Sequence, residues 1–72
     1  MQEKYFVKLH EFGATAELGE YETLKEAIRV ARRACRNASF GNDVQAVIWQ
    51  NKNGNWQPYI KYVGRSARKV WL

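Results

Sequence analysis

Cysteine, proline, histidine and methionine each occur once in this sequence, and long apolar runs are missing. A single cysteine excludes an internal disulfide framework. No segment approaches the roughly 20 apolar residues that a membrane helix needs, and the first residues lack an apolar run of signal-peptide length. We therefore expect a soluble cytoplasmic protein without a membrane partner, located in the host cytoplasm if a phage encodes it.

Residues that carry catalysis are equally scarce. His10 stands beside Glu11 on an expected strand, where neighbouring side chains point to opposite faces and cannot form an acid–base pair. Cys35 falls within a helical apolar stripe, which favours a small buried hydrophobe over a nucleophile. Metal-ligand spacing, a phosphate-binding glycine loop and paired carboxylates are all missing. The sequence predicts a non-enzymatic protein with no catalytic residue, metal or cofactor.

What is present suffices for one domain over residues 1–72, because 46% of the 72 residues are hydrophobic and 14% are aromatic. The net charge of +5 is unevenly distributed. Residues before Lys25 carry two basic and five acidic side chains, whereas the remainder carries ten basic and two acidic ones. A nucleic acid or an acidic protein surface would dock on the basic part.

The segment from Thr23 to about Ala38 is the clearest amphipathic helix. Thr23 and Glu26 form a capping box, in which the hydroxyl accepts one backbone N–H and the carboxylate accepts another. The segment from Asn37 to Gly41 offers an exit through a residue that tolerates a left-handed conformation. The apolar residues recur three or four positions apart and form one stripe that should face a sheet: Leu24, Ala27, Ile28, Ala31, Ala34 and Cys35.

A basic ridge runs along the opposite side of this helix. Its members follow an i, i+4, i+7, i+11 pattern beside one further arginine, and they are Lys25, Arg29, Arg32, Arg36 and Arg33. Long cationic side chains are also good helix formers on a solvated face. Ordinary surfaces, however, intersperse both signs of charge. A solvated face and a surface for an anionic partner both remain open at this point.

Short strands surround the helix in the sequence. Gly19 suggests a bulge or a strand end, and the Asn53-Gly54 pair predicts a type I′ hairpin. Pro58 lacks a backbone donor, so it should face away from a ladder partner or lie at an edge. The expected strands are Lys4–His10, Ala14–Tyr21, Val44–Gln50, Trp56–Val63 and Arg68–Leu72.

The order β(β)αββ(β) predicts an α+β fold, a two-layer sandwich with one α-helix packed on an antiparallel sheet of four or five strands. One helix covers one face, so the other face is open to water or to a partner. The sequence has three Trp, four Tyr and three Phe. Their combined aromatic surface is larger than one helical stripe of small residues can bury. Some rings should therefore lie on the open face, while Trp71 and Leu72 are expected to dock.

A second basic set lies on the last hairpin and the tail, interleaved with aromatic residues. Cations neutralise phosphates and rings offer stacking surfaces, which suits nucleic acid. Tyr, Trp and Arg also dominate protein interfaces. For any single ring, packing in the core is the commoner role. The set comprises Lys61, Arg65, Arg68, Lys69, Tyr59, Tyr62 and Trp71.

Three stretches carry a resemblance to a known family: KYFVKLHEF at residues 4–12, the helix with its arginine run, and the hairpin with GNW at 54–56 and RKVW at 68–71. Together they resemble small phage anti-CRISPR proteins, the single-helix, antiparallel-sheet inhibitors of type I-F CRISPR surveillance complexes. The resemblance implies binding to Cas7-type backbone subunits and obstruction of target-DNA hybridisation. It also implies contact with double-stranded DNA through Lys61, Arg65, Arg68 and Lys69.

The leading hypothesis is a non-enzymatic inhibitory binding protein of phage or mobile-element type that blocks a nucleic-acid-guided host complex. One alternative is a stand-alone DNA- or RNA-binding module. Another is an assembly domain whose open sheet face forms a homodimer, so we expect a monomer or a weak homodimer. The favoured contacts are Arg29, Arg32, Arg36, Lys61, Arg65 and Arg68.

Overall fold

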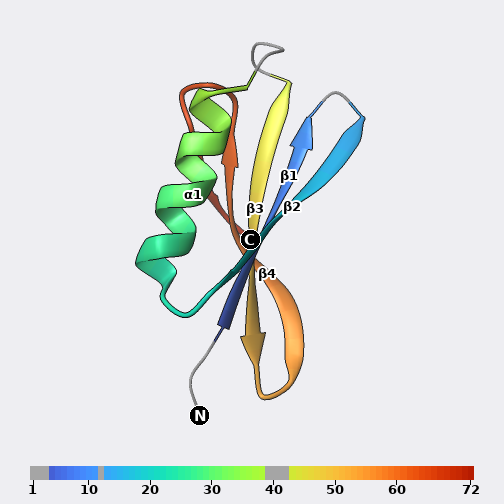
Figure 1. Cartoon of the computed structure of the whole chain (residues 1–72), viewed down its shortest axis with the longest axis vertical. Helices are drawn as coiled ribbons and strands as arrows, with labels where there is room; N and C mark the ends of the chain where they lie inside the picture. Colours follow the sequence, from blue (N-terminus) through green and yellow to red (C-terminus); the bar gives the residue numbers. More distant parts are fainter. Residues whose placement is uncertain (1–3, 12, 39–42) are drawn as a thin grey trace.

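The computed structural model describes residues 4–11, 13–38 and 43–72. One helix lies across one face of a five-stranded antiparallel sheet with the strand order β2-β1-β3-β4-β5 (Figure 1). The expected two-layer α+β sandwich is confirmed. The elements are β1 (Lys4–Glu11), β2 (Ala14–Tyr21), α1 (Leu24–Arg36), β3 (Val44–Lys52), β4 (Asn55–Val63) and β5 (Arg68–Trp71). No described helix has the length and apolar character needed to cross a bilayer.

The start of α1 follows the sequence prediction closely. The Glu26 N–H donates to Thr23 Oγ1 over 3.2 Å, so the predicted N-cap is confirmed. The Glu26 carboxylate accepts from the Thr23 hydroxyl over 3.0 Å, where a capping box predicted the Thr23 backbone N–H. The helix ends at Arg36, and its C-cap Asn37 has a φ of −94°. Gly41, the residue expected to allow a left-handed exit, lies outside the described residues.

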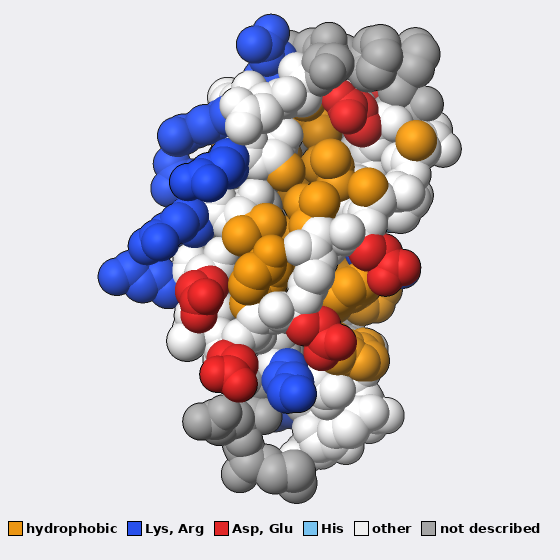
Figure 2. Space-filling model, viewed as in Figure 1, with side chains coloured by type: hydrophobic (Ala, Val, Ile, Leu, Met, Phe, Trp, Pro, Cys, Tyr) orange, Lys and Arg blue, Asp and Glu red, His pale blue; other side chains and the backbone are white. Residues whose placement is uncertain are grey.

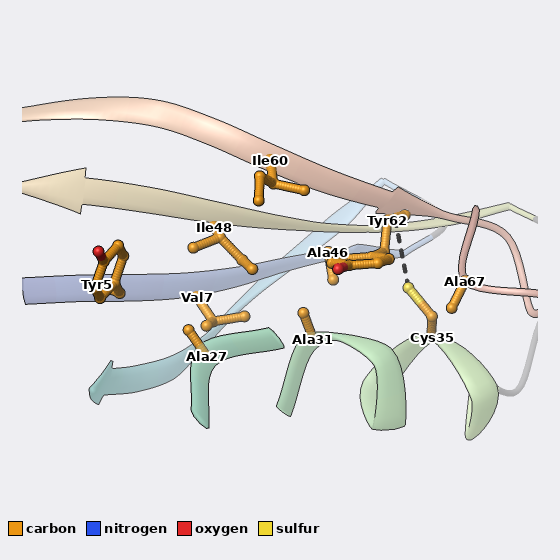
Figure 3. Packing of buried hydrophobic residues seen from close by; sticks show 10 residues of the cluster. All are labelled: Tyr5, Val7, Ala27, Ala31, Cys35, Ala46, Ile48, Ile60, Tyr62 and Ala67. Carbon is orange, nitrogen blue, oxygen red and sulfur yellow. Dashed lines mark hydrogen bonds between the residues drawn. The ribbon is translucent and has the colours of Figure 1, made fainter. Parts of the chain in front are cut away.

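Small side chains on α1 bring the helix close to the sheet. Ala27, Ala31 and Cys35 have no exposed surface. The helix packs mainly on β1 and β3, and Cys35 lies beside Tyr62 of β4 (Figure 3). The sheet supplies the larger side chains of this core, among them Ile48 and Ile60. Burying one such isoleucine stabilises the fold by about 1.5–3 kcal/mol. The predicted burial of Cys35 is confirmed.

Two predicted irregularities of the sheet are also confirmed. Val7 pairs with Gly19 but Lys8 pairs with Glu17, so Leu18 is the extra residue of a β-bulge. At the β3–β4 turn, Asn53 and Gly54 have φ values of 54° and 85°, as a type I′ hairpin requires. The Gly54 N–H donates to Asn51 Oδ1 over 3.1 Å. The polar residues of this tip therefore serve turn chemistry.

Pro58 occupies a part of β4 where strand pairing is one-sided. It lies opposite Trp49 on β3, next to a second register shift. β5 pairs only with residues 60–63 of β4, so the other side of Pro58 has no neighbouring strand among the described residues. The expected edge position is therefore confirmed.

The prediction that the last two side chains dock was wrong. Trp71 is 62% exposed and Leu72 is 57% exposed. The physical reason is that α1 crosses β1 and β3 and makes no contact with β5 in the described part of the chain, so it does not cover Trp71. The backbone is still held, because the Leu72 N–H donates to the Tyr59 carbonyl over 3.1 Å.

Candidate binding surfaces

The five cations of the predicted ridge are all exposed on one side of α1. They border a shallow hollow of about 530 Å³ that Ile28 and Asn37 also line. Figure 2 shows Lys and Arg side chains gathered along α1 at the left of the view. Glu26 is the only acid within the helix. We call this set the basic flank: Lys25, Arg29, Arg32, Arg33 and Arg36.

The basic flank lies on the side of α1 that faces β4. Burial raises the pKa of the Tyr62 phenol, and the positive charge of Arg32 partly opposes that shift, which places Arg32 near this β4 residue. Cys35 lies on the same side, with its Sγ atom 3.4 Å from the Tyr62 carbonyl oxygen. The opposite side of α1 faces β2. Figure 2 shows exposed hydrophobic side chains there, with the Lys and Arg side chains of α1 on the other side.

The β4–β5 turn brings the second basic set toward one end of the basic flank. Ala67, in this turn, is buried in the same cluster as Cys35 near the end of α1 (Figure 3). Arg65 stands two residues before Ala67 and is exposed, and Arg36 directly follows Cys35. The end of α1 and the β4–β5 turn therefore lie side by side, with Arg36 on the former and Arg65 on the latter.

The remaining cations of the second set divide between the two faces of the sheet. Tyr62 points toward α1, so the neighbouring Lys61 points to the open face. Arg68 pairs with Val63 and lies on that open face as well. Lys69 pairs with Tyr62 on the helix side, and its Nζ atom lies 5.0 Å from the Trp71 ring centroid.

The two predicted aromatic contacts, Tyr59 and Tyr62, differ in their exposure. Tyr62 is 3% exposed and belongs to the core, so its ring offers no stacking surface to a partner. Tyr59 is half-buried and meets the Trp71 ring edge-on, with centroids 5.6 Å apart. Only the Tyr59–Trp71 pair therefore adds an aromatic surface beside Lys69.

Sequence reasoning missed a hollow of about 300 Å³ on the open face of the sheet. Phe6 pairs with Trp49 across β1 and β3, and the Phe6 and Trp56 rings meet edge-on with centroids 6.0 Å apart. Strand alternation places Phe6 and Lys8 on one face. The pairing of three strands could not be read from the sequence. The lining residues are Phe6, Lys8, Glu20, Trp49 and Trp56.

Among the described titratable side chains, Cys35 is buried in the core and His10 is exposed on β1. Burial raises the pKa of the Cys35 thiol, although the Ala46 backbone N–H partly stabilises the thiolate. His10 is exposed, as expected, and its Nδ1 atom lies 3.1 Å from Thr15 Oγ1. Among residues 4–11, 13–38 and 43–72, no group of three or more His, Cys, Asp or Glu side chains could hold a metal ion.

Comparison of the chain with protein-family models, with curated proteins and with solved structures found no match. Two surfaces of the described residues could bind a partner. One is the basic flank on the helix side, and the other is the hollow lined by Phe6, Trp49 and Trp56 on the open face, which we call the aromatic hollow.

Proposed function

We propose that the protein is a non-catalytic nucleic-acid-binding module whose basic flank contacts the phosphate backbone of a duplex. The observation that supports this proposal is the alignment of five exposed cations on one side of a 13-residue helix. From Lys25 to Arg36 the helix rises about 16 Å. That length matches roughly five phosphates at the 3.4 Å rise of one DNA strand. Arg65, on the adjoining turn, extends the basic surface beyond the end of the helix.

A second candidate uses the same surface for a different partner. A phage-type inhibitor resembling the anti-CRISPR proteins would dock on a nucleic-acid-guided complex, with Cas7-type subunits as the contact. The observation that favours it is the acidic side of the molecule, because Glu17 and Glu20 are exposed on β2, the edge strand opposite β5. A surface divided in this way suits a protein of mixed charge better than a uniformly anionic polymer.

The test is a titration of a fluorescein-labelled 20-base-pair duplex, read by fluorescence anisotropy at about 50 and 200 mM salt. The double variant Arg29→Glu/Arg36→Glu should bind at least about tenfold more weakly and should lose close to two counterions of salt dependence. The matched control Lys4→Glu/Lys52→Glu changes the net charge equally at exposed positions outside the flank. It should weaken binding far less.

Equal losses in the two double variants would show that net charge, not the basic flank, drives binding. A wild-type protein that fails to bind the duplex at low salt would contradict the nucleic-acid proposal. The inhibitor candidate would then be tested by capture of a purified type I-F surveillance complex, again with both double variants.

A further inference from the structure

We propose that the aromatic hollow on the open face binds an unpaired base of single-stranded nucleic acid. This site lies on the opposite side of the sheet from α1 and takes a different ligand from the basic flank. It therefore goes beyond the proposed duplex binding and does not depend on it.

The rings of the hollow offer stacking surface that the fold leaves uncovered. Phe6 and Trp49 are half-buried neighbours on adjacent strands, and Trp56 is 41% exposed at the rim. Trp56 meets Phe6 edge-on, with an interplanar angle of 62°. A planar base can stack on such rings whatever its sequence, because every base has a π face.

Two lysines lie in the row beside the rings. Glu17, Lys8, Val47 and Lys61 lie opposite one another on β2, β1, β3 and β4. Phe6, Trp49 and Pro58 form the next row on the same face. Neighbouring rows on one face are about 7 Å apart, twice the rise per residue of a strand. A base held among the rings thus places its phosphates within reach of Lys8 and Lys61, and Arg68 adds a third cation on this face.

The position of Lys8 argues against a cationic ligand. Its Nζ atom already lies 5.9 Å from the Phe6 ring centroid and 5.7 Å from that of Trp49. An incoming cation would have to displace an ammonium group and would be repelled by it. The same charge attracts an anionic chain.

The polar groups of the hollow suit a base better than a free phosphate. Glu20 lines the hollow and would repel a phosphate placed inside it, but its carboxylate can accept a hydrogen bond from a base amino group. The Trp49 indole N–H is buried and has no hydrogen-bond partner among the described residues.

The test uses a fluorescein-labelled, 12-nucleotide single-stranded DNA of mixed sequence at about 150 mM salt, where long-range attraction is screened. Trp56→Ala should weaken binding about 5- to 150-fold, the range measured for loss of one stacked base. Lys8→Met should also weaken binding and should reduce its salt dependence. The matched control is Trp56→Phe, which keeps an aromatic ring at the same exposed position. It should retain most of the affinity that Trp56→Ala loses.

Three results would overturn the proposal. One is no binding of the single strand by the wild-type protein, and another is an equal loss in Trp56→Ala and Trp56→Phe. The third is a dimer in sedimentation that Trp56→Ala converts to monomer, which would make the hollow an interface between two copies. Circular dichroism melting checks that each variant folds. If Trp56→Ala does not fold, Lys8→Met, at a surface position, still tests the site. Duplex binding through the basic flank should survive Trp56→Ala, so the two proposals fail separately.

Discussion

The thiol of Cys35 donates a hydrogen bond to the backbone carbonyl of Tyr62, with 3.4 Å between sulfur and oxygen (Figure 3). This contact joins the last turns of α1 to β4 across 27 positions of sequence. It adds to the buried face formed by Ala27, Ala31 and Cys35, and it places the Cys35 edge of the helix against β4. The side that carries Arg32 and Arg36 therefore faces the β4–β5 hairpin, and the basic flank adjoins Arg65 rather than β2.

The buried Cys35–Tyr62 pair predicts loss of stability in alkali. Burial raises the pKa of both side chains above their ordinary values of 9.0 and 10.0. Above these values the unfolded chain releases protons that the native state retains, so the free energy of unfolding falls as the pH rises. The stability that comes from keeping these two buried groups protonated is fully present below about pH 9. Each group can contribute at most about 1.4 kcal/mol per pH unit to this decline.

Urea unfolding between about pH 8 and 11 would measure this effect. The double variant Cys35→Ala/Tyr62→Phe lacks both titrating groups, so its stability should decline less steeply with pH, whatever its stability at pH 7. An unchanged alkaline slope in the double variant would mean that other groups cause the decline.

The N-cap of α1 predicts a local and specific loss. Thr23→Ala removes the oxygen that accepts from the Glu26 N–H, and it should lower the free energy of unfolding by about 1 kcal/mol. Thr23→Ser keeps that oxygen and should cost less than half as much. Urea unfolding at neutral pH would measure the change in the free energy of unfolding for both variants. Equal losses in the two variants would show that the threonine methyl group, not the cap, stabilises this end.

The fold and one of the two surfaces could be predicted from the sequence because their signals are local. Thr23 and the apolar spacing after it define the helix, and the same periodicity gathers Arg29, Arg32 and Arg36 on one side. Asn53-Gly54 defines the hairpin by its backbone preference. Each of these signals involves residues that lie close together in the sequence.

The aromatic hollow could not be predicted because it depends on pairing between distant strands. Phe6 and Trp49 are 43 positions apart and meet only through the β1–β3 register. The exposure of Trp71 depends similarly on how far α1 extends across the sheet. Helix position and strand register are set by the packing of the whole core, and no short stretch encodes them.

The hairpin tip allows a test of backbone conformation without side-chain contacts. Gly54 has a φ of 85°, and an added Cβ would meet no atom within 4 Å. Gly54→Ala should therefore cost about 1–2 kcal/mol from the left-handed backbone alone. A synthetic chain with D-alanine at this position prefers positive φ and should be at least as stable as the wild type. Equal losses with both alanines would indicate a steric clash and contradict this account.

The close approach of α1 to the sheet predicts that Ala31 tolerates no larger side chain. Ala31 has no exposed surface and lies in the core between α1 and the sheet, whereas Ala34 is half-buried. Ala31→Leu should cost about 1–3 kcal/mol through overpacking, and Ala34→Leu should cost less than 1 kcal/mol. If the protein folds, Ala31→Leu should also raise α1 from the sheet and separate the basic flank from Arg65.

Duplex binding by the same two variants links this packing to function. Ala31→Leu should weaken binding several-fold without changing any charge, because the cations no longer lie in one surface, while Ala34→Leu should bind normally. Anisotropy at low salt measures both, and thermal unfolding shows whether each variant is native at the temperature used. If Ala31→Leu is folded and binds as the wild type does, then α1 alone suffices for binding and its height above the sheet has no role.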